Sequence, residues 1–141
     1  MSHYIDASAL VAALVSEPHS QRARLWLEAQ PAGQVFISDW THTEVASALS
    51  QKLRSGQLTI DQRAEALTTW RRLHTASLQT LAIVPQHFEL ATAFANQHDT
   101  GLRAGDALHL AVAASAGFPI VTLDKTMADA APILGIPVEP L

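Results

Sequence analysis

The stretch "HYIDASALVAAL", residues His3 to Leu14, decides how the fold is interpreted, because it begins as a short apolar strand and becomes a helix with an aspartate at the join. The Asp6 carboxylate can act as the N-cap of that helix by accepting backbone N–H groups. It can also serve a ligand site, since functional groups of open α/β sheets gather beyond the carboxyl ends of the strands. Taken alone, Asp6 is better explained as a cap.

Three further acids stand at expected helix starts. Asp124 follows an apolar strand in "VTLDKTMADAA", Asp106 lies in the first turn of the helix in "LRAGDALHLA", and Glu44 follows "VFISDW" with Thr41 as the expected cap. Each one can be explained separately by capping or by the helix dipole. The carboxyl ends of parallel strands share one edge of a sheet, however, so the four carboxylates are predicted to converge on one crevice.

Short β-branched runs alternate with segments of helical periodicity, which predicts βαβ units and an α/β fold with a mostly parallel sheet of about five short strands. The expected strands are "YI", "QVFIS", "TLAIV", "FPIVTL" and "GIPVE". A capping box of Thr59 and Gln62 predicts a helix that runs to about Leu78. The 141 residues contain no repeat or linker, so we expect a single domain over residues 1–141.

The amino-acid composition limits the kinds of ligand and catalytic site that the protein can have. Nine Lys and Arg against thirteen Asp and Glu give a net charge of -4, which argues against binding nucleic acid by bulk electrostatics. The absence of cysteine excludes thiolate metal sites and a cysteine nucleophile. Converging carboxylates without adjacent Lys or Arg need a cation, and oxygen ligands favour magnesium or manganese.

No targeting or membrane segment is expected. The N-terminus has no basic region before a long apolar run, and the most apolar stretch, residues 107–123, is interrupted by Gly117 and Pro119. We therefore expect a cytoplasmic protein without a membrane span.

The ordered set "YIDASAL", "TEVASAL", "LRAGDALHLAVA" and "VTLDKTMADAA" resembles the PIN domain family of metal-dependent ribonucleases, and within it the VapC-like toxins. The resemblance covers essentially the whole chain and implies a three-layer α/β/α fold. It implies that magnesium, or manganese in its place, supports hydrolysis of single-stranded RNA, and that an antitoxin protein restrains the enzyme. The family's catalytic and metal-binding acids correspond to Asp6, Glu44, Asp106 and Asp124, and its Asp-x-Ser/Thr and Thr-x-Asp signatures correspond to Ser8 and Thr122.

Several other side chains are candidates for a supporting role. Arg103 and Lys125 flank two of the acids and can line an RNA path. His109 can orient Asp106 or touch substrate, but between apolar residues it also fits a buried structural histidine. Asp129 can extend the acid cluster or lie on the surface.

The tryptophans divide into two groups. Trp40 is the one expected near substrate. Trp26 and Trp70, with several leucines of the early helices, are expected to exceed what the core can hold, which predicts a homodimer and an antitoxin-binding surface.

Two rival functions stay open. A phosphotransfer or phosphatase domain would use Asp6 as the phosphoacceptor, but it predicts a second acid beside Asp6, where Ala7 and Ser8 stand. A non-catalytic α/β interaction module predicts weak metal binding and no RNA cleavage.

Overall fold

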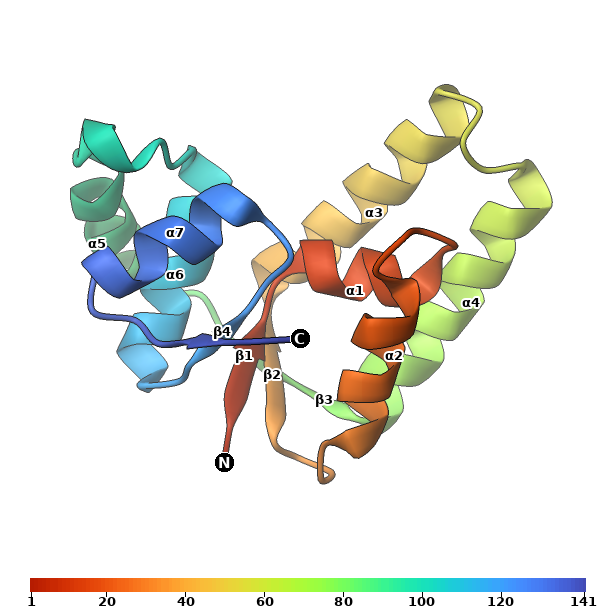
Figure 1. Cartoon of the computed structure of the whole chain (residues 1–141), viewed down its shortest axis with the longest axis horizontal. Helices are drawn as coiled ribbons and strands as arrows, with labels where there is room; N and C mark the ends of the chain where they lie inside the picture. Colours follow the sequence, from red (N-terminus) through yellow and green to blue (C-terminus); the bar gives the residue numbers. More distant parts are fainter.

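The computed structural model describes residues 1–141 and has three layers, with a five-stranded parallel sheet between two groups of helices (Figure 1). The strands are ordered β3-β2-β1-β4-β5. In chain order the elements are β1 (His3–Ile5), α1 (Ala7–Leu14), α2 (Ser20–Ala29), β2 (Val35–Ser38), α3 (Asp39–Arg54), α4 (Ile60–Ala76), β3 (Leu78–Leu81), α5 (Pro85–Ala95), the 3-10 turn η1 (His98–Thr100), α6 (Ala104–Ala116), β4 (Ile120–Val121), α7 (Lys125–Ile133) and β5 (Val138–Glu139).

The two faces of the sheet pack against different helices because successive strand side chains point in opposite directions. Ile5 and Ile37 belong to one buried cluster with residues of α1, α3 and α4. Tyr4 and Ile120 belong to a second cluster with residues of α5, α6 and α7. Helices α1–α4 therefore form one lobe and α5–α7 form the other, on either side of the sheet (Figure 1). The predicted α/β/α fold is confirmed.

The predicted helix boundaries are partly confirmed. Thr59 and Gln62 form the expected capping box, with reciprocal bonds of 2.9 Å and 3.1 Å between the backbone N–H of each and the side chain of the other. Gly117 ends α6 in the left-handed conformation, at φ 72°, where a residue with a side chain would be strained. This turn feeds the chain into β4, as the sequence indicates.

The predicted start of α3 is wrong. The helix begins at Asp39 with Ser38 as its N-cap, and Thr41 Oγ1 accepts a hydrogen bond of 3.1 Å from the Ser38 backbone N–H. Ser38 and Thr41 are both good capping residues, but the Ser38 backbone is extended, at φ -124° and ψ 173°, as an N-cap requires, whereas Thr41 already lies inside the helix. Glu44 consequently lies in the second turn of α3, where its side chain is not needed for capping.

The strand predicted at "TLAIV" is displaced. β3 begins at Leu78 and ends at Leu81, because these residues pair with Val35–Ser38 of β2, one after another. Val84 is the N-cap of α5, and Pro85 opens that helix. The strand therefore ends three residues before the predicted run does.

Trp26 and Trp70 do not form a surplus apolar surface. Trp70 is 6% exposed within the first core cluster, and Trp26 packs against the same cluster. The large exposed apolar side chains lie elsewhere and are Met1, Leu25, Ile60, Val84, Phe88 and Ile133. None of the helices combines the length and apolar character needed to cross a membrane.

Candidate functional site

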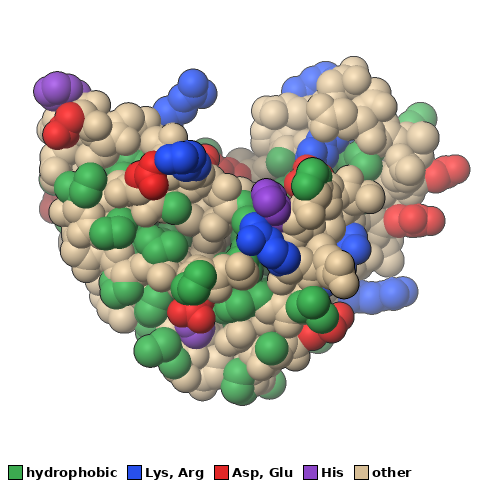
Figure 2. Space-filling view, in the orientation of Figure 1, with side chains coloured by type: hydrophobic (Ala, Val, Ile, Leu, Met, Phe, Trp, Pro, Cys, Tyr) green, Lys and Arg blue, Asp and Glu red, His purple; other side chains and the backbone are tan.

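A notch separates the two helical lobes in the space-filling view (Figure 2), above the edge of the sheet where the strands end in the same orientation (Figure 1). The four strand pairings are all parallel, so the carboxyl ends of the strands point the same way. Asp6 follows β1 as the N-cap of α1, and Asp124 follows β4 as the N-cap of α7. Figure 2 shows basic side chains on both lobes beside the notch.

Asp6 is the most deeply placed of the four acids, at 2% exposure. Ser8 Oγ donates to both of its oxygens, at 2.7 Å and 2.9 Å, and Thr122 Oγ1 donates to Oδ2 at 2.6 Å. The Ala9 backbone N–H donates to Oδ1 at 3.2 Å, which is the expected cap bond. Burial raises the pKa of the Asp6 carboxyl, while the hydrogen bonds from Thr122, Ser8 and Ala9 act in the opposite direction. Ser8 and Thr122 therefore act on Asp6 directly.

Asp124 and Asp106 lie at the starts of α7 and α6. Asp124 Oδ1 accepts a bond of 2.9 Å from the Met127 backbone N–H, and Asp106 Oδ2 accepts one of 3.3 Å from the Arg103 backbone N–H. Burial raises the pKa of Asp106, and the negative charges of Asp124 and Glu44 raise it further. Asp106 therefore lies close enough to both of these acids for their charges to disfavour its ionised form.

Glu44 reaches this group from α3 and is bonded to a buried histidine. Its Oε2 lies 2.7 Å from Nε2 of His109, and His109 Nδ1 lies 2.6 Å from the Tyr4 hydroxyl. His109 is 1% exposed, so the prediction of a buried histidine is confirmed, whereas its ring nitrogens contact Tyr4 and Glu44 and not Asp106, which it was expected to orient.

The candidate basic residues do not neutralise the acids. Lys125 Nζ donates to Asp129 Oδ2 at 2.7 Å on the exposed side of α7, so Asp129 is a surface partner of Lys125. The Arg103 side chain is exposed and forms no ion pair, and its backbone forms the N-cap of α6. None of the four acids pairs with a lysine or arginine.

The side chains of the four acids are of the chemical type that binds a divalent cation, but they are not arranged around a common point in this structure. No group of three or more His, Asp and Glu side chains is arranged to hold a metal ion as it stands. Asp6 is turned toward Ser8 and Thr122, and Glu44 toward His109. The donor set is nevertheless all oxygen, has no lysine or arginine partner and contains two acids whose pKa is raised. Such a set favours magnesium or manganese, which bind through one or two carboxylates and several waters.

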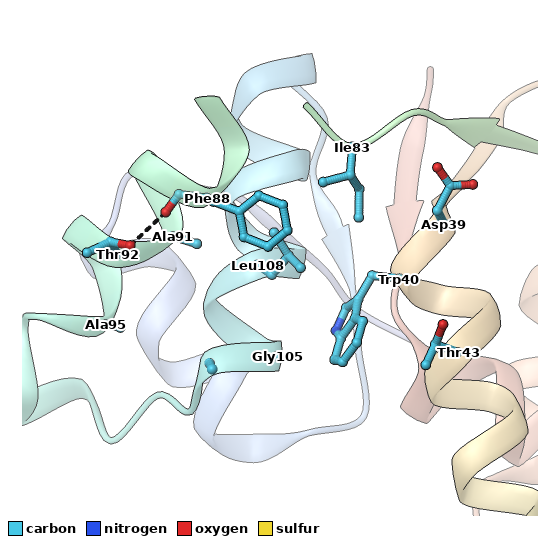
Figure 3. Close-up of a pocket in the computed structure, with 11 residues that line it drawn as sticks. Asp39, Trp40, Thr43, Ile83, Phe88, Ala91, Thr92, Ala95, Gly105 and Leu108 are labelled. Atoms are coloured by element: carbon cyan, nitrogen blue, oxygen red, sulfur yellow. Dashed lines mark hydrogen bonds between the residues drawn. The ribbon is translucent and has the colours of Figure 1, made fainter. Parts of the chain in front are cut away.

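An apolar pocket of about 580 Å³ adjoins the acids. Trp40 of α3 faces Phe88 of α5 and Leu108 of α6 across it (Figure 3). Gly105 also lines it, and a Cβ on Gly105 would lie 2.7 Å from Glu44 Oε1 and 3.3 Å from the Trp40 indole. The Trp40 indole, which was expected near substrate, and the Glu44 carboxylate therefore both lie next to Gly105.

Comparison with known proteins agrees with this arrangement. The PIN domain family matches residues 3–132, which is most of the chain. The chain belongs to the PIN domain family. Among its relatives, Ribonuclease VapC45 of Mycobacterium tuberculosis is 33% identical over 97% of this chain and 94% of that protein. Ribonuclease VapC3 of Pyrobaculum aerophilum is 30% identical over 97% of this chain and all of that protein.

Solved structures of other proteins share the fold. A chain of a toxin-antitoxin complex from Klebsiella pneumoniae superposes with a TM-score of 0.67 at 25% identity, covering 99% of this chain and 98% of that one. The resemblance read from the four sequence motifs is therefore confirmed at the level of the family.

Proposed function

We propose that this PIN domain is a divalent-metal-dependent endoribonuclease that cleaves single-stranded RNA and acts in the cytoplasm as the toxin of a toxin-antitoxin pair. The observation that carries the proposal is the set of four acids, Asp6, Glu44, Asp106 and Asp124, at the carboxyl edge of the sheet without a lysine or arginine partner. Magnesium or manganese bound there would activate a water and stabilise charge on the phosphorus.

The chain's own residues have separate tasks in this proposal. Asp6 forms the floor of the site, held by Ser8 and Thr122. Asp106, Asp124 and Glu44 lie at the surface and are only partly buried, so they can reach a cation shared with an RNA phosphate. Exposed Arg103 and Lys125 lie beside Asp106 and Asp124 and can attract the RNA backbone.

The relatives support the activity and the partner. Two of them carry the name ribonuclease, and one solved neighbour is part of a toxin-antitoxin complex. We extend both features to this chain, including the single-stranded substrate that the PIN family resemblance implies. We also propose a homodimer, which uses the exposed Phe88 of α5 and the exposed Val84 that caps this helix, instead of the tryptophans favoured by the sequence.

The rival phosphotransfer function fits the geometry less well. Both oxygens of Asp6 accept hydrogen bonds and the residue is buried, so it is poorly placed to attack phosphorus. No second acid stands beside it in the sequence. The non-catalytic alternative is separated from the nuclease by direct assay.

The test is cleavage of a labelled single-stranded RNA by the purified chain. We expect cleavage with manganese or magnesium, none with a chelator, and recovery when the metal is restored in excess. Asp124→Asn, which keeps a good N-cap residue, should be inactive. Activity that survives chelation, or no cleavage of any single-stranded RNA by the wild type, would refute the proposal.

A further inference from the structure

We infer that His109 is a positioning residue for Glu44, that Tyr4 fixes the His109 ring, and that the missing side chain at Gly105 leaves room for the second Glu44 oxygen. The inference rests on the proposed function, because it concerns how one of the four acids is presented to the metal and the RNA. It gives a role to His109, Tyr4 and Gly105, none of which belongs to the four acids.

The hydrogen bonds form one continuous chain from the sheet to the site. The Tyr4 hydroxyl lies 2.6 Å from His109 Nδ1, and His109 Nε2 lies 2.7 Å from Glu44 Oε2. Ser38 Oγ lies 2.8 Å from the same tyrosine hydroxyl. A neutral imidazole with its proton on Nε2 satisfies every member: Ser38 donates to Tyr4, Tyr4 donates to Nδ1, and Nε2 donates to Glu44.

The two ends of this series of hydrogen bonds differ in burial. Tyr4 and His109 are enclosed in the core, so neither can exchange its partner for water. The Glu44 side chain is 29% exposed and stands at the solvent end. A glutamate side chain on a helix surface samples several rotamers, and a fixed donor removes that freedom before any ligand arrives. The buried Tyr4 and His109 therefore orient the partly exposed Glu44 carboxylate.

The position of His109 on α6 links two acids. Asp106 and His109 are three residues apart, so they lie on the same face of the helix. The same helix turn thus carries one acid and the donor that holds another acid, Glu44 of α3. The relative placement of α3 and α6 is therefore fixed at the point where their acids meet.

The absence of a Cβ atom at Gly105 leaves space for the Glu44 carboxylate. A Cβ there would lie 2.7 Å from Glu44 Oε1, closer than real contacts allow, and 3.3 Å from the Trp40 indole. Its φ is not in the left-handed region, so the backbone itself would accept alanine. An alanine at this position should push the Glu44 carboxylate aside while favouring the helix, since alanine is the better helix former.

The test compares Mn²⁺ affinity by calorimetry, the metal-free melting temperature and RNA cleavage in the full chain. His109→Phe should weaken Mn²⁺ binding about 10- to 100-fold, the usual effect of losing a partner of a metal ligand. His109→Gln, whose amide can donate to Glu44, should recover part of that loss, and Tyr4→Phe should give a smaller loss in the same direction. Gly105→Ala should weaken Mn²⁺ binding without lowering the metal-free melting temperature.

His3→Phe is the matched control, because His3 is also a buried histidine but contacts Trp26 and Glu139 instead of the four acids. It should leave Mn²⁺ affinity unchanged whatever it does to stability. Wild-type Mn²⁺ affinity in His109→Phe, or equal losses in His109→Phe and His109→Gln, would overturn the role of His109. If His109→Phe does not fold, His109→Gln, Tyr4→Phe and Gly105→Ala decide, and wild-type affinity in all three would overturn it. A wild-type protein that binds no Mn²⁺ would overturn the proposed function together with this inference.

Discussion

Thr122 donates a hydrogen bond of 2.6 Å to Asp6, although the two residues are 116 positions apart in the chain. The bond joins the end of β4 to the end of β1, which are neighbouring strands of the sheet. Thr122 Oγ1 also accepts from the Asp124 backbone N–H at 3.0 Å. One hydroxyl therefore connects two of the four acids.

Thr122→Val should destabilise the metal-free protein by about 1–3 kcal/mol, because the buried Asp6 carboxylate loses a donor that valine cannot replace. It should also raise the pKa of Asp6, which the Thr122 bond lowers. Chemical denaturation measures the first effect. Thr68→Val is the control, since that hydroxyl bonds only to the Ala64 carbonyl on an exposed helix surface. Equal stability losses for the two variants would contradict a special role for Thr122.

Asp106→Asn should melt no lower than the wild type at pH 7 without metal. The folded pKa of Asp106 lies above its ordinary value of 3.8, mainly through burial, so the ionised form destabilises the native state. That penalty is fully present above the folded pKa and disappears as the pH falls toward the unfolded value. The advantage of the variant should therefore shrink as the pH is lowered toward 4.

Asp61→Asn supplies the contrast for this measurement. Asp61 lies in the first turn of α4, where a negative charge stabilises the helix dipole by about 0.3–1 kcal/mol. Its loss should lower the melting temperature at pH 7. If Asp106→Asn behaved in the same way, Asp106 would be an ordinary helix-start charge.

Phe88→Asp should convert the proposed homodimer into a monomer. Phe88 is 55% exposed beside the apolar pocket, and a charge there cannot be buried without a partner. Size-exclusion chromatography with light scattering gives the mass. Ile60→Asp, at an apolar position of α4 that is 75% exposed, should leave the mass unchanged. A monomeric wild type, or a Phe88→Asp dimer, would remove α5 from the interface.

The sequence predicts the parts of this protein that depend on local pattern. The strand–Asp–helix motif places Asp6 and Asp124 correctly as N-caps, because an aspartate directly after a strand is a favoured capping residue for the helix that follows. The Thr59 capping box is correct for the same reason. These features are settled within a few residues of chain.

The sequence does not predict the contacts that hold Glu44. His109 lies 65 positions from Glu44 and 105 from Tyr4, and no periodicity links such distant residues. The predicted start of α3 is wrong for a related reason: Ser38 and Thr41 have similar capping propensity, and the point at which the helix begins depends on where β2 ends its pairing with β3, at Ser38. The spacing of Asp106 and His109 on one helix face is the single local sign of this network.

Titration of Mn²⁺ into the wild type and into Asp6→Asn, Glu44→Gln, Asp106→Asn and Asp124→Asn tests the central claim most directly, because it asks whether four separate acids form one cation site. We expect saturable binding by the wild type and, in every variant, a loss of affinity at least as large as the 10- to 100-fold loss typical of an outer partner. Folding of each variant is checked by its metal-free melting curve. Wild-type affinity in two or more folded variants would contradict the claim.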